Sequence, residues 1–234
     1  MPGVMINVAA VLLGGGAGLL LGNRVSERFQ QTMTQGLSLC ILLIGLSGAL
    51  DGTDTIGAIV CLVVGALIGE ACDIERRLNG LGEWVQRRMR GRGSNVSQGF
   101  VAASLLFCVG AMAVVGSLDA GLFGEYDTLI AKSMLDGVSA LLMATTLGIG
   151  VMLSAASVLV YQGGIALLAG LVAPALSDAA VALMSGVGGL LIAGLGLNML
   201  GVSRIRVGNL LPAVFLPIIY VPVVEWASAL LGLA

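Results

Sequence analysis

Long apolar runs separated by short polar stretches dominate the chain. A transmembrane helix needs about 20 mostly apolar residues, and charge-free runs of this kind recur along the whole sequence. The pattern predicts spans near residues 4–22, 35–51, 56–71, 98–117, 129–150, 160–177, 180–200 and 208–231. The charge-free stretch 137–177 is too long for one span. Candidate breaks within it are Gly148, Gly150 and Gly163–Gly164. We expect an all-α polytopic membrane protein of about eight helices, forming a single transmembrane domain over residues 1–234.

Composition strengthens this picture and excludes several kinds of site. Hydrophobic residues make up 58% and charged residues 10% of the chain, against about 25% charged residues in soluble domains. The 36 glycines indicate a Gly-rich bundle, because small residues let helices approach closely in lipid. The chain has no histidine, and its four cysteines show no C-x-x-C spacing. We expect no cofactor, no metal site, no catalytic residues and no nucleic-acid partner.

The arginines predict the orientation of the chain. All ten fall on one side of an eight-span arrangement, and the positive-inside rule identifies that side as the cytoplasm. Both termini are then expected outside the cytoplasm. The N-terminus lacks a positively charged region of the kind found in cleaved signal peptides, so the first helix is expected to remain.

Residues 72–97 differ from the rest of the chain, because arginines alternate there with apolar residues at helical spacing. This pattern predicts a basic amphipathic helix on the cytoplasmic membrane surface. Its candidate lipid-contacting residues are Arg76, Arg77, Arg87, Arg88, Arg90 and Arg92. An alternative is a plain interfacial connector that obeys the positive-inside rule. A shorter segment of the same kind, with Val25, Phe29 and Met33, follows the first span.

A Gln-Gly pair recurs at Gln35, Gln98 and Gln162, at nearly equal spacing. Each pair is expected where a span leaves the cytoplasm, and the returning spans end in Gly-rich stretches, two of them at Glu70 and Asn198. The pattern is typical of two-helix repeats, which in membrane proteins often frame a path. Short matches in a Gly-rich chain also arise by chance, so the repeat stays one of two interpretations.

Lys132, the only lysine, and Asp136 stand one turn apart within a predicted span. At 1.5 Å per residue, Lys132 lies about 4–5 Å and Asp136 about 10 Å from the outer end. The lysine can reach the headgroups, whereas the short aspartate must pair, face water or be protonated. The two residues form either a structural clamp or an ion or proton site. Further path candidates are Asn198, Asn209, Gln35, Gln98, Gln162 and Asn7.

Several longer stretches resemble a known family. "QGFVAASLLFCVGAMAVVGSLDAGL", "KSMLDG", "GGLLIAGLGLNMLG" and "IRVGNLLPA" are similar to the YqgA-like bacterial membrane proteins of the family called domain of unknown function 554. The resemblance covers nearly the whole chain. It implies a bacterial inner-membrane protein with seven or eight helices, and it brings no substrate and no catalytic residues.

Two functions remain open at this point. The embedded polar residues and the prolines of the last span favour a transporter or channel for an ion or small solute, with Asp136 at its site. The alternative is a non-transporting scaffold that binds lipid or a partner through residues 72–97. Membrane lipids and a second copy of the chain are the expected partners.

Overall fold

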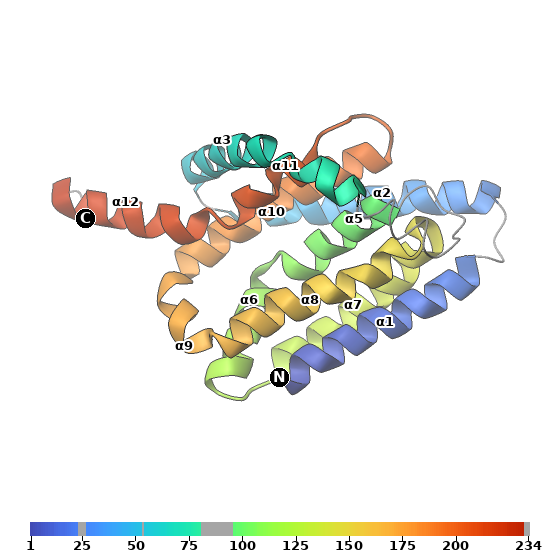
Figure 1. Cartoon of the computed structure of the whole chain (residues 1–234), viewed down its shortest axis with the longest axis horizontal. Helices are drawn as coiled ribbons and strands as arrows, with labels where there is room; N and C mark the ends of the chain where they lie inside the picture. Colours follow the sequence, from blue (N-terminus) through green and yellow to red (C-terminus); the bar gives the residue numbers. More distant parts are fainter. Residues whose placement is uncertain (23–26, 53, 81–95, 232–234) are drawn as a thin grey trace.

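Helices form all the regular structure in the described part of the chain, residues 1–22, 27–52, 54–80 and 96–231. Figure 1 shows this computed structural model as an elongated bundle. Six helices are long and apolar enough to cross a membrane. They are α1 (Pro2–Gly22), α2 (Glu27–Asp51), α3 (Thr55–Cys72), α7 (Asp127–Leu147), α8 (Gly150–Leu167) and α10 (Asp178–Met199). The expected all-helical polytopic membrane protein is confirmed.

Two further spans are bent. The helices α5 (Val96–Cys108) and α6 (Ala111–Leu122) meet at 59°, and the pair formed by residues 207–214 and 217–230 meets at 45°. The second pair consists of α11 (Val207–Leu210), η2 (Leu211–Val214) and α12 (Pro217–Leu231). Prolines that lack a backbone N–H interrupt this pair. When each bent pair is taken as one span, the total reaches the eight expected.

The sixth span lies ten residues earlier than expected. We expected it at 160–177, whereas α8 covers Gly150–Leu167. Gly148 adopts φ +70°, a conformation that glycine accepts easily, and it reverses the chain within two residues of the end of α7. The pair Gly163–Gly164 stays inside α8. The candidate break at Gly148 and Gly150 is therefore confirmed, whereas the one at Gly163–Gly164 is wrong. Hydropathy could not choose between them, because the stretch carries no charge.

Short elements fill the residues that we had assigned to the end of that span. The chain after α8 passes through α9 (Ala169–Val172) and η1 (Ala173–Ala175) before α10 begins. Ser177 caps α10, and its hydroxyl oxygen accepts a hydrogen bond from the N–H of Ala180.

The structure describes the two predicted surface segments only in part. The apolar positions Phe29 and Met33 belong to α2 itself, which begins at Glu27 and continues unbroken into the membrane. Residues 74–80 are helical and include Arg76 and Arg77. The remaining lipid-surface candidates, Arg87, Arg88, Arg90 and Arg92, lie outside the described residues.

Close helix pairs hold the bundle together. Figure 1 shows α1, α7 and α8 side by side. The helices α1 and α7 run parallel, and a Cβ at Gly14 or Gly18 would overlap a backbone carbonyl of α7. The helices α2 and α10 run antiparallel and touch through Gly45 and Gly189. In the apolar stretch of α10, 78% of the residues are buried, against 17% in that of α2. The helix α10 is therefore central and α2 is an outer helix.

Candidate functional site

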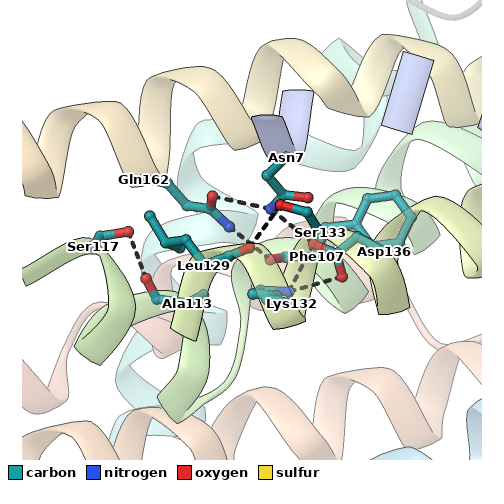
Figure 2. A network of polar contacts seen from close by, with 9 residues as sticks. All are labelled: Asn7, Phe107, Ala113, Ser117, Leu129, Lys132, Ser133, Asp136 and Gln162. Carbon is teal, nitrogen blue, oxygen red and sulfur yellow. Dashed lines mark hydrogen bonds and ion pairs between the residues drawn. The ribbon is translucent and has the colours of Figure 1, made fainter. Parts of the chain in front are cut away.

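Four polar side chains from three helices meet inside the bundle (Figure 2). Asn7 comes from α1, Lys132 and Asp136 from α7, and Gln162 from α8. We call these four residues the Asp136 cluster. The Lys132 and Asp136 side chains are only 8% and 7% exposed, and Asn7 and Gln162 are fully buried. The sequence analysis named Lys132 and Asp136 as a pair and Asn7 and Gln162 as separate candidates, and the fold brings all four together.

The charged pair is symmetric. The Nζ atom of Lys132 donates to both carboxylate oxygens of Asp136, each at 2.8 Å. Side chains four residues apart share one face of a helix, so α7 alone creates this contact. Asp136 is therefore paired and sits in apolar surroundings, the arrangement that makes an embedded carboxylate tolerable.

Asn7 connects the pair to the next helix. Its Nδ2 atom donates to Asp136 Oδ2 at 2.9 Å and to Gln162 Oε1 at 3.1 Å. The Oδ1 atom of Asn7 is buried and accepts no hydrogen bond from any residue that the structure describes. A buried polar atom without a partner costs about 1–3 kcal/mol. The cluster therefore contains one oxygen that the described residues leave without a hydrogen bond.

The cluster also reaches the bent span. Gln162 Nε2 lies 3.5 Å from the carbonyl oxygen of Phe107, one residue before α5 ends at Cys108. Carbonyls at a helix end lack intrahelical donors and need other partners. The contact is long for a hydrogen bond, so this carbonyl is only weakly held.

The small residues of α1 position Asn7. A Cβ at Gly3 would lie 3.1 Å from Leu129 of α7, and Gly14 makes a close backbone contact further along. The two helices are therefore in contact on both sides of Asn7, which holds its amide against Asp136. Ser133, between the charged residues in sequence, bonds within α7 to the Leu129 carbonyl at 2.6 Å.

A second polar cluster lies at the end of the bundle where α3 ends and α11 begins. We call it the Glu70 cluster. Asn209 Nδ2 donates to Glu70 Oε2 at 2.6 Å, and Arg206 pairs with Glu70 Oε1 at 2.7 Å. The N–H of Glu75 donates to Asn209 Oδ1, and the N–H of Gly208 donates to the Glu75 carboxylate, both at 2.7 Å. Asn209 and Glu75 thus cap each other's helices.

Asn198 lies near this end but serves its own loop. Its Nδ2 donates to the Ile205 carbonyl at 2.7 Å, and its Oδ1 accepts from Ser203 and from the Ile205 N–H. The structure therefore places Asn198 and Asn209 apart from Asp136. The sequence analysis named Glu70 only as the end of a returning span and did not name Glu75. Both were overlooked as site residues because their partners are distant in sequence.

The glutamines do not occupy equivalent places. Gln98 is in the first turn of α5, Gln35 is exposed inside α2, and Gln162 is buried in the second half of α8. Our placement of Gln162 at the cytoplasmic start of a span is wrong, because α8 begins at Gly150. The three Gln-Gly pairs therefore do not mark one repeated position.

The Glu70 cluster gives a stability prediction. Asn209→Ala removes the part-buried hydrogen bonds of this side chain with Glu70 and with the N–H of Glu75. The N–H of Glu75 then lacks its acceptor, so we expect a loss of about 1–3 kcal/mol in the free energy of unfolding. Asn79→Ala is the matched control, since Asn79 makes an exposed contact with Ser97. Denaturant titration in detergent micelles measures both. Equal stability of the two variants would contradict the capping role.

Comparisons with known proteins agree with this membrane architecture. The chain is 36% identical over 202 residues to "Uncharacterized protein YqgA" of Escherichia coli (strain K12), covering 84% of this chain and 86% of the relative. It is 28% identical over 203 residues to "Uncharacterized membrane protein YdfK" of Bacillus subtilis (strain 168), covering 85% and 86%. No solved structure matches the chain. The profile of the family described as "Protein of unknown function (DUF554)" matches residues 2–222, and the chain therefore belongs to this family of bacterial membrane proteins.

Proposed function

We propose that this protein moves an ion or a small solute across the bacterial inner membrane, and that the Asp136 cluster is its site. The observation that carries the proposal is the buried Lys132–Asp136 pair, held between three helices and joined to a bent span. Charges at the centre of a bilayer cost about 2.5–3.5 kcal/mol each on insertion scales. Ionisable residues kept at that cost commonly mark ion or proton paths.

The alternative, a purely structural clamp, is less well supported by the surroundings of the pair. Replacing a buried ion pair by apolar residues is often neutral or stabilising, so packing alone does not require one. The α1–α7 contact already has close backbone approaches at Gly14 and Gly18. A clamp would also be expected to satisfy all its polar atoms, whereas Asn7 Oδ1 has no partner among the described residues.

The bent spans support the same proposal. Transporters often place their sites beside discontinuous helices, whose freed backbone groups face the substrate or coupling ion. Here the 59° bend between α5 and α6 lies next to Phe107, which Gln162 contacts from inside the cluster. Bending at this point would change the access of the cluster to one side of the membrane.

Reconstitution tests the transport proposal. Purified protein in proteoliposomes should carry a proton or monovalent cation current down an imposed gradient, read by an internal pH dye and by isotope uptake. Asp136→Asn removes the carboxylate charge, and we expect flux to fall by about 100-fold or more, as for loss of a charge-assisted site. Asp127→Asn, at an exposed carboxylate in the first turn of α7, is the matched control. Equal flux in wild type and Asp136→Asn would contradict the site assignment.

We also propose that both termini lie outside the cytoplasm. The described arginines flank the start of α2 and the ends of α3 and α10, and these ends would face inward under the positive-inside rule. Alkaline phosphatase fused after Ala234 should be active in the periplasm, and a fusion after Ser203 should be inactive. The reverse pattern would contradict this orientation.

A further inference from the structure

Asn7 carries a side-chain oxygen that has no hydrogen-bond partner among the described residues. Its side chain is fully buried, and Oδ1 accepts no hydrogen bond from the residues that the structure describes. Figure 2 shows this oxygen on the side of the amide away from Gln162. Turning the amide over would not satisfy it, because the oxygen would then face the oxygens of Asp136 and Gln162. The amide orientation is therefore fixed by its two acceptors.

Beside this oxygen, a tethered cation already occupies the carboxylate. The Lys132 ammonium lies 2.8 Å from each Asp136 oxygen, where a small metal ion would bridge the same two atoms. Carboxylate and amide oxygens are the ligands that hard cations prefer. One carboxylate balances one positive charge, so the available ligands suit a monovalent ion better than a divalent one.

We propose that Asp136 and Asn7 together bind a small monovalent metal cation, Na⁺ or Li⁺, in competition with the Lys132 ammonium. This inference rests on the proposed function and names the ion of that site. Lys132 lies one turn nearer the start of α7 than Asp136. Its long stem lets the ammonium withdraw toward the membrane boundary when the metal ion binds. Charge balance at Asp136 is kept in both states.

The bent span supplies a further ligand of the same type. The Phe107 carbonyl lies one residue before the end of α5, and its contact with Gln162 Nε2 is long, at 3.5 Å. Freed carbonyls of discontinuous helices commonly coordinate Na⁺ in transporters. A cation bridging Asp136, Asn7 and this carbonyl would link α7, α1 and the bend between α5 and α6, which gives ion binding a route to change the bend.

Cation-dependent thermal unfolding of the detergent-purified protein tests this inference. Wild type should be stabilised saturably by NaCl or LiCl relative to choline chloride at equal ionic strength. Lys132→Met removes the competing ammonium and should lower the apparent Kd for Na⁺ about tenfold or more. Asp136→Asn should abolish the Na⁺ effect, and Asn7→Leu should weaken it about tenfold. Asn79→Ala, outside the cluster, should match wild type.

The key comparison uses two variants in case one folds poorly. Lys132→Gln should bind Na⁺ more tightly than wild type in the same way as Lys132→Met, because both lack the ammonium. Identical unfolding temperatures in NaCl and choline chloride for wild type and for the Lys132 variants would overturn the inference. Saturable Na⁺ binding without flux in proteoliposomes would uphold it and overturn the transport proposal. Flux without any specific Na⁺ effect would do the opposite.

Discussion

Lys132→Met should lower the free energy of unfolding by about 3–5 kcal/mol, because it leaves the buried Asp136 carboxylate without its positive partner. Asp136 is too short to reach the membrane boundary. Among the described residues, Asn7 of α1 would be its one remaining hydrogen-bond donor. The measurement is denaturant titration in mixed micelles, with helicity as the signal. Asp136→Asn should cost less, since a lysine left without its partner can extend toward the headgroups.

The double variant Lys132→Met/Asp136→Asn is the control for this prediction. It removes both charges and keeps an oxygen at position 136 to accept the hydrogen bond from Asn7. We expect its stability to lie within about 1–2 kcal/mol of wild type, because a neutral, well-packed replacement of a buried ion pair is often tolerated. A double variant as unstable as Lys132→Met would contradict the view that an unpaired charge causes the loss.

Gly18→Val should strongly disrupt the α1–α7 interface. A Cβ there would overlap the Leu141 carbonyl oxygen and lie 2.9 Å from the Cβ of Ala144. Backbone atoms cannot move aside like a flexible side chain, so the helices must separate. We expect a loss of about 3 kcal/mol or more, at the upper end for overpacking, together with a weakened Asn7–Asp136 contact. Thermal unfolding in detergent measures the loss.

Gly16→Val is the matched control on the same helix. A Cβ at Gly16 would meet only the terminal methyl of Met152, at 3.9 Å, and a flexible methionine can repack. We expect Gly16→Val to change the free energy of unfolding by less than about 1 kcal/mol. If the two variants were equally unstable, the general effect of valine in a helix, rather than the close approach of α1 to α7, would explain the loss.

The sequence predicted the parts of this structure that depend on local spacing. Apolar runs place most spans, and the four-residue spacing of Lys132 and Asp136 predicts their contact, because a helix brings such positions onto one face. Both the membrane class and the ion pair follow from neighbours in sequence.

Other features depend on which helices are neighbours, and the sequence alone did not reveal them. Asn7 stands 129 residues before Asp136 along the chain, and Gln162 lies on the helix that follows α7. Hydropathy does not say that α1 and α8 flank α7. Gly148 and Gly150 were candidate breaks, but the next span was expected at residue 160 instead of Gly150, because no charge marks a boundary in this stretch. The mutual capping of Asn209 and Glu75 was missed because the two residues are distant in sequence.

The most direct test of a functional Asp136 cluster is ion flux through the folded, charge-free double variant Lys132→Met/Asp136→Asn. In proteoliposomes under an imposed proton or Na⁺ gradient, wild type should conduct and the double variant should not, although both unfold at similar denaturant concentration. Loss of flux with the fold intact assigns the pair to transport. Flux equal to wild type in the double variant would show that the pair only holds the helices together.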